Sequence, residues 1–127
     1  MLFAIFDLLA LFELSHWGDE LIESYSHGMK QRLVMSAALL HDPEVIIVDE
    51  PMVGLDPMAI KMVKELFKSI VAMNEQGITI LLVEQNIRNA LEIADRAYLL
   101  ENGRITMEGA PDQFLENDHV KKAYLGL

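Results

Sequence analysis

The pattern of apolar and polar positions predicts an α/β chain. Two runs of mostly β-branched and aliphatic residues, 45–48 and 78–83, stop at polar side chains, which is typical of fully buried parallel strands. Between them, apolar residues recur at helical spacing over 60–71. A strand, a helix and a second strand in this order predict a parallel crossover unit in which the helix covers the sheet.

Further helices and a hairpin are predicted on either side of this unit. An alanine- and leucine-rich run at 33–40 is a strong helix by propensity. The dipeptide Asn102-Gly103 joins the runs 96–101 and 104–108, and it is typical of a two-residue hairpin turn. Other helices are predicted over 2–14, 17–24, 87–94, 111–115 and 119–125.

The chain is predicted to form a single domain over 1–127. No repeat, low-complexity tract or linker interrupts it, and 127 residues are enough for one modest core. We divide this domain into a helical part, 1–43, and an α/β part, 44–127.

Charge and composition exclude some classes of function. A net charge of −10 argues against nucleic-acid binding, because phosphate contacts need clustered Lys and Arg. The chain has no cysteine, so it has no disulfide and no thiolate metal site, as is common in cytosolic proteins. Its four histidines lack metal-ligand spacing.

Two acidic residues, Asp49 and Glu50, follow the first predicted strand directly. The carboxyl ends of strands face the ligand crevice in open α/β sheets, so a metal ligand or a general base would be useful there. A solvated loop start is the alternative.

Ser26 and Gly28 stand at the predicted N-terminus of the helix that contains 33–40. Free backbone N–H groups, the positive end of the helix dipole and a hydroxyl together suit an anion such as phosphate. The alternative is that Ser26 is simply an N-cap and Gly28 eases the turn. The printed sequence contains no GxxxxGKS/T loop to hold nucleotide phosphates.

Five motifs occur in a specific order: SHG before a QR-containing helix, then VIIVDEP, GLDP, EQN and ADRAYLLENGRI. Together they resemble the C-terminal portion of the nucleotide-binding subunit of ABC transporters. The resemblance implies a partial P-loop NTPase fold without the Walker A strand. The tail is most similar to ATPases of branched-chain amino-acid importers, whereas YSHGMKQRL is more similar to exporter-type ATPases.

The resemblance implies a role for each matched residue. Asp49 matches the Walker B aspartate that holds Mg²⁺, and Glu50 matches the carboxylate that activates the attacking water. Ser26 and Gly28 match the signature motif, which reaches the γ-phosphate of ATP held by the other subunit of a dimer. Asp56 matches the loop that links the two sites across that dimer.

The sequence departs from the family pattern in several places. In the signature motif, usually LSGGQ, Tyr25 replaces the leucine, His27 the first glycine and Met29 the glutamine. Gln85 stands where the family usually has a switch histidine, and its amide can donate a hydrogen bond without titrating near neutrality. The Walker A loop, the glutamine loop and the aromatic residue that stacks on adenine belong to the half of the family's domain that the printed residues do not match.

The resemblance further implies ATP and Mg²⁺ as cofactors, a membrane-spanning transporter subunit as partner, and a place at the cytoplasmic face of the membrane. Phe3, Phe6 and Phe12 are candidate residues for that interface and equally good core residues. Without a phosphate-binding loop, we expect no ATPase activity from this chain alone. In the family's fold the strand over 78–83 lies between the Walker B and Walker A strands, so the unmatched Walker A strand would leave an apolar edge exposed. This implies a homodimer, a domain-swapped oligomer or a rearranged sheet. Alternatives are a non-catalytic, self-associating fragment or scaffold, and a DNA-repair or translation ATPase of the same superfamily.

Overall fold

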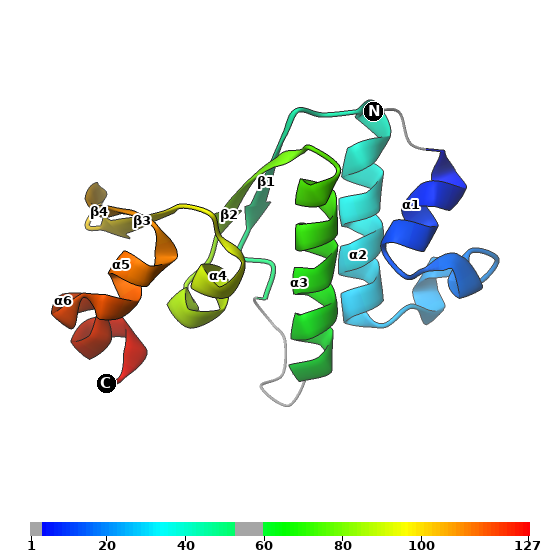
Figure 1. Ribbon diagram of the computed structural model, residues 1–127. Coiled ribbons are helices and arrows are strands. Elements are labelled where there is room, and N and C mark those ends of the chain that lie inside the picture. The colour runs from blue at the N-terminus through cyan, green and yellow to red at the C-terminus, as the bar shows by residue number, and fades with distance from the viewer. Residues whose placement is uncertain (1–3, 53–59) are drawn as a thin grey trace. The chain divides into compact units, whose positions relative to one another are not determined.

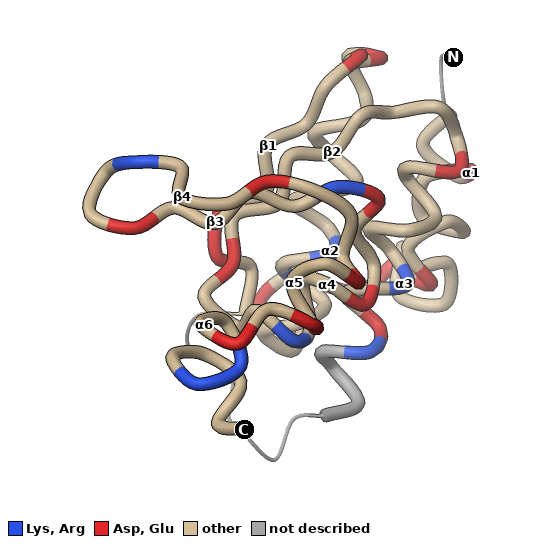
Figure 2. Tube along the Cα trace, turned by 60° about the vertical axis from the view of Figure 1, so that its left-hand side comes forward, with Lys and Arg blue, Asp and Glu red and all other residues tan. Residues whose placement is uncertain are grey.

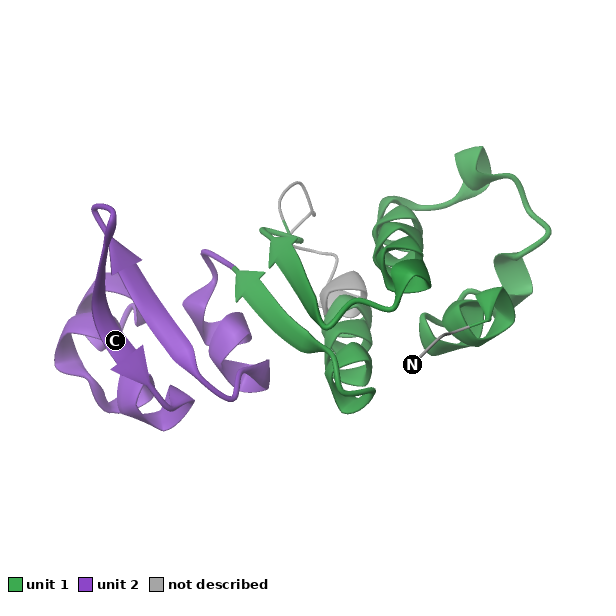
Figure 3. Cartoon of the chain, turned by 90° about the horizontal axis from the view of Figure 1, so that it is seen from above, with its two compact units in different colours: residues 1–83 green, residues 84–127 purple. Residues whose placement is uncertain are grey.

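The computed structural model describes residues 4–52 and 60–127 (Figure 1). The chain separates into two compact units, Met1–Val83 and Glu84–Leu127 (Figure 3). The prediction of a single domain over 1–127 stays a prediction. In the described residues, no helix has both the length and the apolar character needed to cross a bilayer.

The first unit contains a parallel strand pair with helices packed beside it. Its helices and strands are α1 (Ile5–Leu11), α2 (His27–Ala38), β1 (Val45–Asp49), α3 (Ile60–Glu75) and β2 (Thr79–Val83). Single 3₁₀ turns lie at Ser15–Trp17, Ile22–Ser24 and Leu39–His41. Helix α3 packs against α2 and β2, and α1 packs against α2.

Strands β1 and β2 pair in parallel, with Ile47 opposite Leu81 and Asp49 opposite Val83. The predicted parallel crossover is therefore confirmed, with α3 as its connecting helix. Four side chains on one face of α3 are buried at helical spacing: Leu66, Phe67, Ile70 and Met73.

The prediction that both strands are fully buried is wrong. Val45, Ile47, Leu81 and Val83 are 57%, 68%, 51% and 44% exposed, and all four point to the same side of the parallel pair. Val48, on the opposite side, is 8% exposed. The described part of this unit covers only one face of the sheet, so every second residue of each strand meets solvent.

The first helix is shorter than predicted because the backbone turns sharply after it. Helix α1 ends at Leu11, and Glu13 takes a left-handed conformation with φ of 56°. This turn lets Phe12 and Leu14 both become fully buried. Of the candidate interface residues, Phe12 is thus a core residue, Phe6 is 83% exposed, and Phe3 lies outside the described residues.

The helix predicted over 17–24 is also wrong, because an extended residue interrupts it. Leu21 has ψ of 136° and separates two single 3₁₀ turns. The Tyr25 hydroxyl donates a hydrogen bond to the Trp17 carbonyl at 2.5 Å and holds this segment closed.

Arg32, in the first unit, is the only charged residue that is buried among the described residues. Basic residues are few along the trace (Figure 2). The Arg32 guanidinium donates to the Phe12 carbonyl at 2.9 Å and lies 3.8 Å from a Glu13 carboxylate oxygen and 3.5 Å from one of Glu65. It thereby joins the end of α1, helix α2 and helix α3.

The second unit is a hairpin with short helices around a small core. Its elements are α4 (Ile87–Ile93), β3 (Ala97–Glu101), β4 (Arg104–Gly109), α5 (Pro111–Glu116), α6 (Asp118–Val120) and a π-helical turn, Lys121–Leu125. Strands β3 and β4 pair antiparallel, and Asn102 and Gly103 have φ of 49° and 75°, which confirms the predicted turn. The core consists of Leu91, Leu99, Phe114 and Val120.

Glu101 is the main hydrogen-bond acceptor of the second unit. Its carboxylate accepts a hydrogen bond from the Tyr124 hydroxyl and one from the Thr106 hydroxyl at 2.8 Å, and it lies 2.9 Å from His119 Nε2. The hydrogen bond from Tyr124 is the largest of these contacts in its effect, and together they lower the pKa of Glu101 from 4.5 to about 2. The hydrogen bond between Tyr124 and Glu101 also raises the pKa of Tyr124. Glu101 therefore connects the hairpin to the C-terminal turn.

We expect Arg32→Met to lower the free energy of unfolding by about 2 to 3 kcal/mol, because the Phe12 carbonyl and the Glu65 carboxylate lose their charged donor. Urea denaturation measures this. The matched control is Arg96→Met, which removes an exposed ion pair with Glu108 at 3.2 Å and should cost less than about 1 kcal/mol. Equal losses in the two variants would contradict the role of Arg32.

The contribution of Glu101 to stability should depend on pH. Because folding lowers its pKa from 4.5 to about 2, the carboxylate stabilises the fold above pH 4.5, and this contribution is lost as the pH falls toward 2. We expect the stability difference between the native chain and Glu101→Gln to narrow over that range in denaturation curves. A difference that stays constant from pH 6 to pH 2 would refute this, and Glu108→Gln serves as the exposed control.

Candidate functional site

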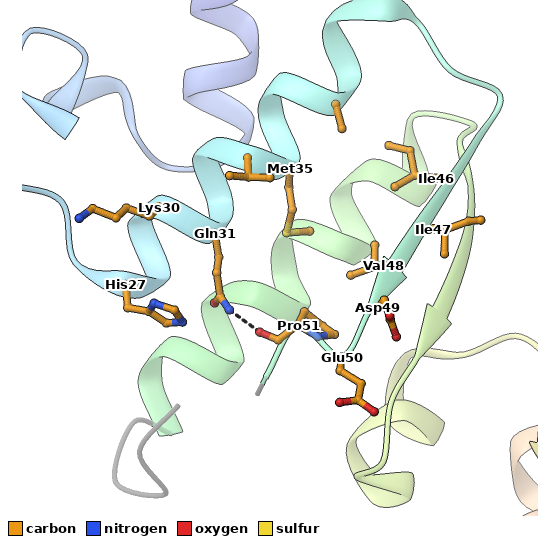
Figure 4. A pocket seen from close by; sticks show the side chains of 12 residues that line it. His27, Lys30, Gln31, Met35, Ile46, Ile47, Val48, Asp49, Glu50 and Pro51 are labelled. Carbon is orange, nitrogen blue, oxygen red and sulfur yellow. Dashed lines mark hydrogen bonds between the residues drawn. The ribbon is translucent and has the colours of Figure 1, made fainter. Parts of the chain in front are cut away.

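A pocket of about 490 Å³ lies between helix α2 and strand β1 (Figure 4). Apolar side chains of both elements form most of its lining, and the two predicted site carboxylates lie at the end of β1. The lining residues are His27, Lys30, Gln31, Val34, Met35, Ala38, Ile46, Ile47, Val48, Asp49, Glu50 and Pro51.

Asp49 and Glu50 occupy the carboxyl end of the parallel strands, as the sequence predicts. Asp49 is the last residue of β1 and is exposed. The Glu50 backbone N–H donates to the Val83 carbonyl at 2.8 Å, which extends the strand pairing by one step. Its φ of 43° is left-handed, which is unfavourable for a residue with a side chain and is characteristic of functional sites.

Ser26 and Gly28 stand at the N-terminus of α2, as predicted. Ser26 is the N-cap, and its hydroxyl accepts a hydrogen bond from the Met29 N–H at 3.3 Å. Ser26 therefore has the N-cap role, and its role toward phosphate stays a prediction. Gly28 belongs to the first helical turn, whose N–H groups lack partners within the helix. His27, between them, lines the same pocket as Asp49 and Glu50.

Gln31 makes a contact that the sequence analysis missed. Its amide nitrogen donates to the Pro51 carbonyl at 2.5 Å, and this bond joins α2 to the loop after Glu50 (Figure 4). The QR pair was part of the motif set, but nothing in the spacing of Gln31 and Pro51 indicated that they meet.

Two predicted site residues lie outside this pocket. Gln85 is exposed and belongs to the second unit, two residues after the end of β2. Asp56 lies outside the described residues. The pocket is thus built from the first unit, and it contains the carboxylate pair and the start of α2.

The pocket suits a magnesium ion only if phosphate and water supply most of the oxygen atoms that bind it. Among the described residues, no three His, Cys, Asp or Glu side chains are grouped closely enough to hold a metal by themselves. Mg²⁺ is usually bound through one or two carboxylates together with waters and phosphate oxygens. The exposed carboxylate of Asp49 fits that arrangement, since it leaves most of the coordination positions to phosphate and water.

Comparisons with known proteins agree on one family. Residues 5–53 match the family model described as ABC transporter. The lipopolysaccharide export system ATP-binding protein LptB of Haemophilus influenzae is 33% identical over 94% of this chain and 48% of its own length. The high-affinity branched-chain amino acid transport ATP-binding protein BraG of Pseudomonas aeruginosa is 44% identical over 80% of this chain and 42% of its own length.

The solved structures give the same result. The ADP conformation of MJ1267, an ATP-binding cassette of an ABC transporter, superposes with a TM-score of 0.80 at 28% identity over 96% of this chain and 48% of its own. The chain belongs to the family of ABC transporter ATP-binding domains and has their α/β P-loop NTPase fold. It spans about half the length of the relatives that it matches.

The left-handed backbone at Glu50 predicts an unusual order of stability between two variants. Both Glu50→Gly and Glu50→Ala remove the carboxylate, so their difference reports the backbone conformation. We expect the glycine variant to be more stable by about 1 kcal/mol in urea denaturation.

The matched control for this prediction is position 49, which lies in the strand. There Asp49→Ala should be more stable than Asp49→Gly by roughly 0.5 to 1 kcal/mol, because Asp49 has no positive φ and glycine loses more backbone entropy on folding than alanine. The same order at both positions would show that Glu50 carries no backbone strain.

Proposed function

We propose that this chain supplies the Walker B residues of one ATP site and the signature residues of the site across a dimer, in an ATP-binding subunit that couples ATP hydrolysis to solute transport across a membrane. One observation carries the proposal: Asp49 and Glu50 follow each other at the carboxyl end of β1 and line a pocket there. Family membership supports it.

Asp49 and Glu50 have separate roles in this proposal. Asp49 holds Mg²⁺ through oxygen, and the ion supplies neutralisation of the phosphate charge when bound. Glu50 accepts a hydrogen bond from the attacking water, orients it and can take its proton. Asp49 ends β1, and the chain leaves the extended conformation at Glu50, so the two carboxylates belong to different backbone conformations.

The remaining site residues act on phosphate or across a dimer. Ser26 and Gly28 present a helix N-terminus to the γ-phosphate of ATP bound by a second subunit, with His27 and Met29 altering the hydrogen bonds that the usual motif makes. Gln85 donates an amide hydrogen bond to the transferred phosphate, and Asp56 links the two sites of the dimer.

The partners follow from the same proposal. ATP needs a phosphate-binding loop that the printed residues do not contain, so we expect this chain alone to be inactive. A homodimer or domain-swapped oligomer stays a prediction, which light scattering tests. The relatives are named as ATP-binding proteins of export and transport systems, and this supports a membrane-spanning partner subunit, with this chain at the cytoplasmic face of the membrane.

Complementation tests the proposed function. The chain is co-expressed with the part of BraG that it does not match, and phosphate release is measured with Mg²⁺ and ATP. We expect hydrolysis from the complex and none from the chain alone. Glu50→Gln should lower turnover about 100-fold or more while ATP still binds, because the water loses its base.

Glu44→Gln is the matched control, since it makes the same acid-to-amide change just before β1. It should leave turnover unchanged. Calorimetric binding of ATP to the chain alone would overturn the proposal that a separate phosphate-binding loop is required.

A further inference from the structure

The backbone around Glu50 is held by two contacts to different elements (Figure 4). The Glu50 N–H donates to the Val83 carbonyl of β2 at 2.8 Å. The carbonyl of the next residue, Pro51, accepts a hydrogen bond from the Gln31 amide of α2 at 2.5 Å. The two-residue segment 50–51 is therefore fixed at both of its ends.

This segment has a backbone conformation that its local sequence opposes. The φ of 43° at Glu50 is left-handed, which is unfavourable for a residue with a side chain. A proline moves the residue before it toward extended backbone, for which φ is negative. Both effects favour an extended Glu50, so contacts from other parts of the chain must maintain the left-handed conformation.

Gln31 is placed to supply such a contact. Proline has no N–H, so its carbonyl is the backbone group through which a hydrogen bond can hold Pro51. The bond is partly buried, and it therefore competes less with water than an exposed bond does. The residue after Gln31 is Arg32, whose guanidinium donates to the Phe12 carbonyl at 2.9 Å and lies 3.5 Å from a Glu65 carboxylate oxygen. These contacts fix the turn of α2 from which Gln31 reaches the loop.

We propose that Gln31 is a positioning residue for Glu50: its hydrogen bond to the Pro51 carbonyl keeps the Glu50 backbone left-handed and thereby sets where the carboxylate lies. This inference rests on the proposed function, in which Glu50 orients the attacking water. Rotation about the N–Cα bond of Glu50 moves its Cβ relative to β1. A Glu50 that relaxes to the extended conformation therefore loses the position from which it orients the water.

Nuclear magnetic resonance of the chain alone tests the conformational step. A positive φ brings the amide and α protons of one residue close together, so the nuclear Overhauser effect between them is strong. Gln31→Met removes the donor and keeps the side-chain length, and we expect it to abolish the strong effect at Glu50. Asp42, with φ of 52°, should keep its strong effect in the same spectrum. Gln76→Met makes the same change at an exposed position, and it should leave both residues unchanged.

Turnover distinguishes positioning from a merely structural contact. In the complex with the part of BraG that this chain does not match, Gln31→Met should lower kcat about tenfold or more. It should leave KM for ATP within about twofold of the native value, because the contact acts on the orientation of the water. Gln76→Met should change neither constant. In a Glu50→Gln background, Gln31→Met should lower kcat by less than about twofold, because it acts through the Glu50 carboxylate.

Each outcome decides the proposal. A strong effect that persists at Glu50 in Gln31→Met overturns it, and so does an equal loss at Asp42, which shows general unfolding. An unchanged kcat, or a tenfold further loss in the Glu50→Gln background, also overturns it. A complex that never hydrolyses ATP overturns the proposed function alone, and the spectra of the chain still decide whether Gln31 holds Glu50.

Discussion

The first unit depends on one buried cation. The Arg32 guanidinium has little contact with water, so its charge must be compensated by the Phe12 carbonyl and by carboxylates of Glu13 and Glu65. These partners belong to the end of α1 and to α3, whereas Arg32 belongs to α2. Satisfying one charge therefore sets how three segments pack, and it sets where the N-terminus of α2 lies.

The position of α2 in turn creates the site. Its first turn and Gln31 line a pocket with the end of β1, and the Gln31 bond to the Pro51 carbonyl holds the loop that follows Glu50. Asp49 and Glu50 are thus presented by a strand end supported from both sides, by β2 through the Val83 carbonyl and by α2 through Gln31. The two carboxylates are the groups able to take part in chemistry, and the packing of α2 beside the strands determines where they lie.

Local sequence predicted much of this fold. The turn at Asn102-Gly103 depends only on residues that accept positive φ, and the Ser26 cap depends only on a hydroxyl within reach of the N–H of Met29. The β1 and β2 pairing was predicted because a strand, a helix and a strand of these lengths have one favourable arrangement. The candidate carboxylates were found because they end an apolar strand.

What the sequence determined by itself was the type and order of the elements and the residues able to bind metal or phosphate, since these follow from the local pattern of side chains. Only the tertiary structure decided which strand face stays exposed, that α1 stops so that Phe12 and Leu14 can both be buried, and that Gln31 meets Pro51. These features depend on contacts between residues far apart in the chain. The apolar character of a residue predicts a preference for burial, but whether the residue is buried depends on which other segments pack against it.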